Sequence, residues 1–365
     1  MLRVAFGLLR HGVEVHAAFP QAAGTSSMIT DCEASGVIYW PFDYDGDSLI
    51  SRCRQVRKLL KDVRPDVVQL TAGWPTEVIE PALACALMSV PMLAIFQLAR
   101  EPIVLAEPRL KRLAWARSRQ QQWMAVSQNN LSSLQHTFRM QLGEMGVLYN
   151  GIEIPSDNYG GEVREILRRE VRAELGIPVA TRILLTTSRL DPQKGHADLL
   201  QIGRGLIDRF SDICFVWAGD GLAGDGKARE RLETEIQKRG LQDHFRLLGY
   251  RTDIERLIHA SDLFVFPSHF EGGCSSSVRE AMVHRLPIVC SDAGGIPEIL
   301  IDGRHALLFP AHDTGRMLSQ LSEALNQPAR MRTLAENGRK RIEEFSSERM
   351  VETYLAAFRK LTLRS

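Results

Sequence analysis

Residues 182–195 read RILLTTSRLDPQKG. After Arg182 the first part is apolar or β-branched and predicts a buried strand, and the loop that follows leads into a helix after the turn at Gly195. The loop carries two cations, Arg189 and Lys194, five residues apart. Their charges and the N–H groups of the helix N-terminus can converge on one anion, and a diphosphate suits this arrangement. The alternative interpretation is a solvated loop with two surface charges.

The same succession of strand, loop and helix recurs along the chain and predicts a parallel α/β architecture. After a helix that ends at His11 and stops at Gly12, the expected strands of the first half are 13–19, 66–70, 92–96, 123–126 and 146–149. Its expected helices are 48–63, one from about 76, 110–119 and 129–141. The second half has expected strands at 182–187, 213–218, 244–248, 263–266 and 287–290, with helices at 197–209, 227–239, 252–259, 275–285 and beyond.

The length of 365 residues suits two domains at roughly 100–200 residues each. Between 151 and 178 the chain turns polar and carries Pro155, Gly160 and Gly161 before a charged helix, which predicts the connection between the domains. The expected division is 1–155, a connecting segment 156–178, 179–345, and a final helix 346–365. Two doubly wound domains bind ligands at the carboxyl ends of their strands, so we expect the site in a cleft between them.

Composition excludes several classes of protein. Lys+Arg 45 against Asp+Glu 44 leaves a net charge of +1, so no global field recruits nucleic acid. The six cysteines form no C-x-x-C pair, which argues against zinc, redox and disulfide frameworks and favours a cytoplasmic chain. The longest apolar stretch, 78–99, is broken by Glu80 and Pro91 and does not predict a membrane span. The first residues, MLRVAFGLLRHG, do not resemble a signal peptide.

A second chemistry-bearing loop, FEGGCSSSVREAM at 270–282, follows an expected strand. Gly272 and Gly273 allow close approach of a ligand to the backbone, and the serines from Ser275 onward are candidates to cap the next helix. Glu271 and Glu280 bracket this N–H cluster, and carboxylates accept hydrogen bonds from vicinal sugar hydroxyls. The combination suggests a sugar nucleotide. Taken singly, Glu280 is more often a solvated helix residue and the serine run a simple cap.

A third loop, SDAGGIPE at 291–298, repeats strand, glycine turn and helix with a proline in the first turn. Gly294 and Gly295 offer further backbone donors, while Glu298 has the alternative role of partner to the helix dipole. Gly219, after the strand 213–218, forms a weaker glycine turn of the same kind.

In this order and spacing, S-R-L-D-P-Q-K-G, L-L-G-Y-R, H-F-E-G-G…R-E-A-M and S-D-A-G-G-I-P-E resemble the donor-binding domain of glycosyltransferase family 4. The first half resembles the family's acceptor domain more loosely, in P-D-V-V-Q, A-V-S-Q and Y-N-G-I. The resemblance implies a retaining enzyme of the GT-B fold, with two Rossmann-like domains facing across a cleft. It makes 1–155 the acceptor-side domain and 179–345 the nucleotide-sugar domain, with 346–365 packing back on the former.

The resemblance also implies roles for individual residues. Arg189 and Lys194 would bind the donor diphosphate and stabilise it as it departs, Glu280 would hold the ribose hydroxyls, and Glu271 would face the transferred sugar. Because cations and helix N-termini stabilise the leaving group, no metal or other cofactor is expected. The residues expected to bind the nucleotide sugar are Glu280, Gly272, Gly273, Cys274, Ser275, Ser276, Tyr250, Arg251, Gly219, Gly294 and Gly295, of which Tyr250 and Arg251 would line the base pocket.

Four features depart from the family pattern. The spacing between Glu271 and Glu280 is one residue longer than usual. Gln69 and Gln97 stand where the family commonly has histidines at the ends of two acceptor-domain strands. The first strand, with its glycine-rich loop, is missing, because the chain starts inside the helix that should follow them. We therefore expect an incomplete first domain, with a true start upstream of Met1 or a degenerate copy as the two explanations, and two strands deprived of a neighbour.

Basic residues crowd two helical windows, 52–64 and 109–119, the second around Trp115. Such helices can touch an anionic membrane surface where lipid-linked acceptors sit, or can simply be solvated faces. The leading hypothesis is a glycosyltransferase that uses a nucleotide-sugar donor and a saccharide or lipid-linked acceptor in surface polysaccharide or glycolipid assembly. The alternatives are a sugar-nucleotide epimerase of the same architecture and a non-catalytic sugar-nucleotide binder.

Overall fold

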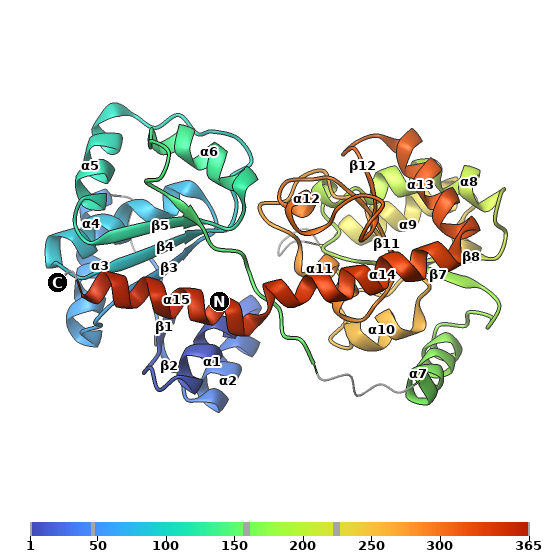
Figure 1. Ribbon diagram of the computed structural model, residues 1–365, viewed down its shortest axis with the longest axis horizontal. Coiled ribbons are helices and arrows are strands. Elements are labelled where there is room, and N and C mark those ends of the chain that lie inside the picture. Colours follow the sequence, from blue (N-terminus) through green and yellow to red (C-terminus); the bar gives the residue numbers. More distant parts are fainter. Residues whose placement is uncertain (1, 45–47, 156–160, 222–226, 364–365) are drawn as a thin grey trace. The chain divides into compact units, whose positions relative to one another are not determined.

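The computed structural model describes residues 2–44, 48–155, 161–221 and 227–363, which form two compact units. Unit 1 comprises Met1–Glu153 and Phe345–Ser365, and unit 2 comprises Ile154–Glu344. Both are α/β units with parallel sheets (Figure 1). The segment 156–178, expected as a connection, contributes its helix α7 (Gly161–Glu174) to unit 2, where it packs on α10 (Ile254–Ala260).

Unit 1 contains two separate parallel sheets among its described residues. One consists of β1 (His16–Phe19) and β2 (Ile38–Pro41), and the other of β3 (Val68–Ala72), β4 (Met92–Phe96), β5 (Gln121–Ala125) and β6 (Gly146–Val147), in that order. All of β4 is buried, whereas most of β3 is only partly buried. Among the described residues β1, β2, β3 and β6 each have a strand neighbour on one side alone, so the missing first strand stays a prediction.

Seven helices of unit 1 surround these sheets in the described part of the chain: α1 (Leu2–Arg10), α2 (Ser26–Ser35), α3 (Leu49–Val63), α4 (Ile79–Met88), α5 (Glu107–Arg117), α6 (Gln128–Phe138) and α15 (Ser347–Thr362). The last helix, α15, contacts α1, β4 and β5 (Figure 1). Its Val351 and Tyr354 join Leu8 of α1 and Ile95 of β4 in one hydrophobic core. The C-terminal residues therefore complete the first unit of the chain.

The sequence analysis did not predict α2 and β2. α2 buries only Cys32 among its residues, so it lacks the apolar stripe that reveals a helix. β2 is short, exposed at both ends and closed by Pro41, as an edge strand can be. The strand expected at 66–70 is displaced to Val68–Ala72, and the helix stop at Gly12 is confirmed by its φ of 75°.

Unit 2 contains one six-stranded parallel sheet in the order β12-β11-β10-β7-β8-β9. The strands are β7 (Arg182–Thr187), β8 (Ile213–Ala218), β9 (Phe245–Leu247), β10 (Leu263–Phe266), β11 (Ile288–Ser291) and β12 (Leu307–Phe309). The helices, besides α7 and α10, are α8 (His196–Ile207), α9 (Ala228–Lys238), α11 (Ser276–Val283), α12 (Ile296–Ile299), α13 (Thr314–Asn326) and α14 (Pro328–Ile342). Every expected strand of the second half is found within a few residues of its predicted bounds.

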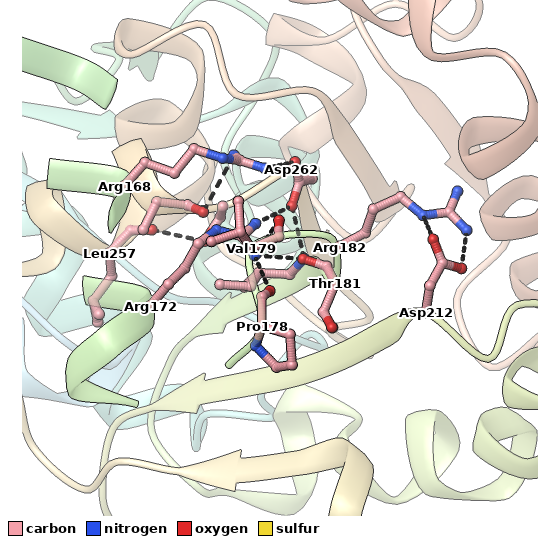
Figure 2. A network of polar contacts seen from close by, with 12 residues as sticks. Arg168, Arg172, Pro178, Val179, Thr181, Arg182, Asp212, Leu257 and Asp262 are labelled. Carbon is pink, nitrogen blue, oxygen red and sulfur yellow. Dashed lines mark hydrogen bonds and ion pairs between the residues drawn. The ribbon is translucent and has the colours of Figure 1, made fainter. Parts of the chain in front are cut away.

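A buried polar network fastens α7 to the amino edge of this sheet (Figure 2). Arg172, with 1% of its side chain exposed, donates to the carbonyl of Pro178 at 3.0 Å and to Oδ2 of Asp262 at 2.8 Å. Arg168 donates to Oδ1 of Asp262 at 2.6 Å, and the backbone N–H of Ile183 donates to Oδ2 at 2.8 Å. One carboxylate thus joins α7, β7 and the start of β10.

None of the helices in the described ranges combines the length and apolar character that a membrane crossing requires.

The crossing of α1 and α15 leaves no space for a side chain at Gly7. A Cβ at this position would lie 2.2 Å from Cγ2 of Val351. We expect Gly7→Ala to destabilise unit 1 by about 1–3 kcal/mol, because overpacking outweighs a gain in helix propensity of about 1 kcal/mol. Urea denaturation measures the change in the free energy of unfolding.

The double variant G7A/V351A should recover much of this loss. Gly205→Ala in α8 is the matched control, since its nearest atom would be 3.9 Å away and the helix propensity gain should dominate. A stability gain in G7A equal to that in G205A would contradict the proposed clash.

Candidate functional site

Four loops meet at the carboxyl edge of the unit 2 sheet, following β7, β8, β10 and β11. Leu190 in the first loop donates its N–H to the carbonyl of Asp220 in the second at 2.9 Å. Gln193 donates from Nε2 to the carbonyl of Phe270 in the third at 2.5 Å. Ser291, at the end of β11, donates from Oγ to the carbonyl of Ser268 at 2.5 Å. The loops that the sequence analysis singled out therefore form one connected structure.

Two of the predicted glycines are required by this contact between loops. Gly294 has φ of 57°, and a Cβ there would lie 1.6 Å from the carbonyl oxygen of Glu271. Gly219 has φ of 147°, and its Cβ would lie 1.8 Å from the carbonyl oxygen of Ser188. Only glycine allows these close approaches. The two positions thus fix the neighbouring loops in place, whereas Gly295 precedes α12 as its N-cap residue.

Lys194 and Glu271 form a buried ion pair at the centre of the loops. Nζ of Lys194 donates to Oε1 of Glu271, and each side chain is 10% exposed. Ser268 donates from Oγ to the same oxygen at 2.7 Å. The sequence analysis gave these residues separate roles, one toward phosphate and one toward sugar. The structure brings them into direct contact, so a ligand that recruits either must share it with the other.

Arg189 is the more accessible of the two predicted cations. Its side chain is 51% exposed, and its partner among the described residues is Asp191 at 3.6 Å. Asp191 also caps the short helix Pro192–Lys194 by accepting from the N–H of Gln193 at 2.9 Å. The guanidinium of Arg189 therefore keeps most of its donors available for an anion.

The glycine and serine segment leads into the N-terminus of α11. Ser275 occupies the N-cap position, yet its side chain makes no capping hydrogen bond, so a simple capping role does not account for it. The first N–H groups of α11, starting at Ser276, have no partner within the helix. Burial raises the pKa of the Cys274 thiol to about 12, so this side chain stays protonated and uncharged. Glu280 is half-buried on α11.

Tyr250 and Arg251 follow a bridge in which Gly219 donates its N–H to the carbonyl of Gly249 at 2.8 Å. Tyr250 is 78% exposed. Arg251 instead donates to both oxygens of Asp253 at 2.7 Å and to Glu174 at 2.8 Å, and these bonds raise the pKa of its guanidinium. The structure thus leaves the ring of Tyr250 open and engages the side chain of Arg251 within unit 2.

Gln69 and Gln97 lie in unit 1 on and after neighbouring strands. Gln69 in β3 donates from Nε2 to Oγ1 of Thr71 at 2.7 Å. Gln97, directly after β4, accepts on Oε1 from Nδ2 of Asn150 at 2.8 Å. Both amides are partly buried and already hydrogen-bonded.

The sequence analysis missed His196, which lies buried at the start of α8 beside the cation loop. Its ring packs edge-on against Trp217 with centroids 4.9 Å apart, and Nε2 lies 3.4 Å from Oγ of Ser188. Burial, with a smaller contribution from Lys194, lowers the pKa of His196 to about 4. A neutral imidazole therefore lies behind Lys194 near pH 7. Its position one residue after the quoted loop was the signal that could have identified it.

Comparison with known proteins identifies the part of the chain that carries this site. The family description "Glycosyl transferases group 1" matches residues 168–341. The match lies within unit 2 and makes this part of the chain similar to the glycosyl transferases group 1 family. The family segment contains all the predicted residues of unit 2 named above, from Arg189 to Gly295.

Curated relatives agree with this assignment. Alpha-D-kanosaminyltransferase of Streptomyces kanamyceticus is 30% identical over 186 residues, which is 50% of this chain and 46% of that protein. Alpha-maltose-1-phosphate synthase of Mycolicibacterium smegmatis is 31% identical over 199 residues, covering 53% and 51%. The chain thus matches about half the length of these relatives.

Solved structures establish the fold across the chain. A glycosyltransferase from Rickettsia africae has a TM-score of 0.85 at 15% identity and covers 100% of this chain and 94% of that one. HepE of Anabaena in complex with UDP has a TM-score of 0.79 at 19% identity and covers 98% and 95%. The GT-B fold predicted from the motifs is confirmed, with two Rossmann-like units.

The buried pair of Lys194 and Glu271 has a testable energetic consequence. Glu271→Leu leaves a buried ammonium without its carboxylate, and we expect a loss of about 3–5 kcal/mol in the free energy of unfolding of unit 2. The double variant Lys194→Met/Glu271→Leu removes both charges and should recover most of that loss. Urea denaturation of the unaltered protein, of Glu271→Leu, of Lys194→Met and of the double variant gives the double-mutant cycle.

The control is the exposed pair of Arg239 and Glu235, whose side chains are 40% and 39% exposed. Glu235→Leu should cost less than about 1 kcal/mol, because water screens such pairs. Equal losses in the free energy of unfolding for Glu271→Leu and Glu235→Leu would show that burial does not strengthen the ion pair of Lys194 and Glu271.

Proposed function

We propose that the protein is a retaining glycosyltransferase that moves a sugar from a nucleoside diphosphate donor to a hydroxyl acceptor. The observation that carries this proposal is the meeting of Arg189, Lys194, Glu271 and the N-terminus of α11 at one edge of the unit 2 sheet. The family of residues 168–341 and the transferase names of the relatives support it. Structures of HepE with UDP and with UDP-glucose support the choice of donor.

In the proposed reaction, the acceptor oxygen forms a bond to the anomeric carbon while the bond from that carbon to the phosphate oxygen breaks. The departing diphosphate carries the developing negative charge and takes the proton of the acceptor hydroxyl. Arg189 and the free N–H groups of α11 stabilise that charge, and this stabilisation is the main catalytic need. No metal and no protein nucleophile are required in this scheme.

Lys194 and Glu271 act together in this scheme. Lys194 has three donors, so it can keep one on Glu271 and direct another to the diphosphate. The remaining capacity of the Glu271 carboxylate can accept from a hydroxyl of the transferred sugar. Glu280 on α11 would accept from the ribose hydroxyls, and Tyr250 would stack on the base. The ion pair of Lys194 and Glu271 would thereby hold the transferred sugar and the diphosphate in fixed positions relative to each other.

Arg189→Ala tests the proposal without disturbing the buried pair, since Arg189 is half-exposed. We expect its kcat/KM for donor to fall roughly tenfold to a hundredfold, because one charge-assisted contact to phosphate is lost. Lys238→Ala, which removes an exposed cation at the end of α9, should leave the rate unchanged. The measurement is release of free nucleotide from a panel of nucleotide sugars, with and without saccharide acceptors.

The same assay separates the alternatives. Donor binding with no nucleotide release under any condition would replace the proposal with a non-catalytic sugar-nucleotide binder. A change of the sugar configuration with the sugar still attached to its nucleotide, and no transfer to an acceptor, would indicate an epimerase. Equal rates for R189A and K238A would remove Arg189 from the phosphate site.

A lipid-linked acceptor is the finer part of the proposal, with a role in surface polysaccharide or glycolipid assembly. Unit 1 offers a surface suited to this acceptor, because α5 exposes Arg109, Lys111 and Arg112 together with Trp115, which is 39% exposed. Arg119 lies over the indole of Trp115, with its guanidinium carbon 5.5 Å from the ring centroid. Basic side chains around an exposed indole suit the anionic surface of a membrane. We therefore include peripheral contact with the inner face of the cytoplasmic membrane.

Vesicles that contain anionic lipid should sediment with the protein, and Lys111→Glu/Arg112→Glu should weaken this binding because each juxtamembrane cation contributes about 1 kcal/mol. The control Lys238→Glu changes charge in unit 2 and should bind as the unaltered protein does. Absence of binding to vesicles with and without anionic lipid would remove membrane contact from the proposal.

A further inference from the structure

The amino edge of the unit 2 sheet is hollowed on the side opposite to the four loops. The hollow has a volume of about 480 Å³. Arg182 begins β7, Leu263 begins β10 and Pro287 directly precedes β11, and all three line it. Helices α7, α10, α13 and α14 contribute the remaining walls. Its size is that of a small-molecule site.

Arginine dominates the charge of this hollow. Five arginines and three carboxylates line it, so the formal charge of the lining is positive. The arginines are Arg164, Arg168, Arg182, Arg285 and Arg332, and the carboxylates are Glu165, Asp262 and Glu336. His259 adds no charge near pH 7, because burial and the neighbouring His284 lower its pKa to about 4.

The carboxylates are already engaged. Asp262 holds Arg168 and the buried Arg172 together, as Figure 2 shows, so one negative charge faces two positive ones. Glu165 lies 3.6 Å from Arg169, which points the carboxylate along α7. Glu336 binds Arg285 at 3.2 Å. The acids therefore do not neutralise the whole cluster.

Arg164 and Arg332 carry the surplus charge. Neither has an ion pair or hydrogen bond in the parts of the chain that the structure describes. Burial lowers the pKa of the Arg164 guanidinium, and repulsion from Arg168 and Arg285 lowers it further, against a smaller opposing attraction from Glu336. An anion placed between α7 and α14 would relieve this repulsion, and the planar guanidinium fork matches the oxygens of a phosphate.

Apart from Ser261, the rest of the lining is apolar. Leu263 and Pro287 lie at the sheet edge, and Leu325, Pro328 and Met331 lie at the junction of α13 and α14. A wall of this kind favours an uncharged organic body over water. The hollow thus combines a cationic rim with an apolar surface in one small volume.

We propose that this hollow is a second binding site, which takes a small organic phosphate with its phosphate between Arg164 and Arg332 and its uncharged part on the apolar wall. The site lies at the sheet edge opposite to Arg189 and Lys194, so it does not depend on the proposed transferase reaction. Its occupant joins α7 to α14, because Arg164 belongs to the former helix and Arg332 to the latter. A ligand that binds the folded state and not the unfolded state stabilises unit 2.

Phenyl phosphate is a suitable probe, because it carries one phosphate and one apolar ring, and inorganic phosphate is its comparison without the ring. Calorimetric titration of the whole chain should give tighter binding for phenyl phosphate than for inorganic phosphate. Hydrogen exchange should slow in 161–174 and 328–342 when phenyl phosphate is bound. These segments contain no residue of the four loops at the other edge.

Arg164→Ala and Arg332→Ala should each weaken phenyl phosphate binding roughly tenfold to a hundredfold. Both variants should fold, because neither side chain holds another element of the described structure. Arg316→Ala is the matched control, since it removes an exposed arginine of α13 outside the hollow and should leave affinity unchanged.

The variant Arg189→Ala separates the two edges of the sheet. The slowing of exchange in α7 and α14 by phenyl phosphate should be the same in R189A as in the unaltered protein. Two results would overturn the proposal: unchanged affinity in R164A and R332A, or slowed exchange confined to 188–195 and 272–276.

Discussion

The ion pair of Lys194 and Glu271 is the interaction on which the architecture of unit 2 depends at its carboxyl edge. It connects the loop after β7 to the loop after β10, in a place where each side chain is 10% exposed. A buried charge without a partner is so unfavourable that neither loop can move alone. Ser268, in the same loop as Glu271, also donates to this carboxylate, and the close approach of Gly294 to the backbone carbonyl of Glu271 brings in the loop after β11. The contacts between these loops therefore fix the surface that carries Arg189 and the N-terminus of α11.

The opposite edge of the same sheet uses charge differently. There Asp262 receives Arg168, Arg172 and the N–H of Ile183, and so fixes α7 with one residue. The surrounding arginines exceed the available carboxylates, and Arg164 remains close to two other cations. At the carboxyl edge one central cation, Lys194, is paired with one carboxylate, Glu271. At the amino edge arginines outnumber carboxylates, so positive charge is in excess. A single sheet thus presents one neutralised centre and one electropositive hollow.

The sequence predicted the elements better than their contacts. Periodicity located five of the six strands described in the second half and missed β12, and the glycine turns placed Arg189, Lys194 and Glu271 on the same sheet edge. It could not show that Lys194 and Glu271 touch, because 77 residues separate them and charge alone does not select a partner. The five arginines of the hollow are scattered from 164 to 332 and form no motif. α2 was not predicted because it buries a single residue, Cys32. The ion pair of Arg251 with Asp253 could have been predicted, because the two residues are only two positions apart in the sequence.

The order of the units along the chain has a consequence for synthesis on the ribosome. Unit 2 lies wholly between residues 154 and 344, whereas the core of unit 1 needs Met350, Val351 and Tyr354 from the last helix. Because chains are made from the N-terminus, unit 2 can fold as soon as it emerges, while the earlier-made unit 1 must wait until α15 has been synthesised. A nascent chain stalled before α15 would carry a finished second unit and exposed apolar side chains on β4 and β5. Chaperone dependence is therefore expected to fall on the half of the protein that is synthesised first.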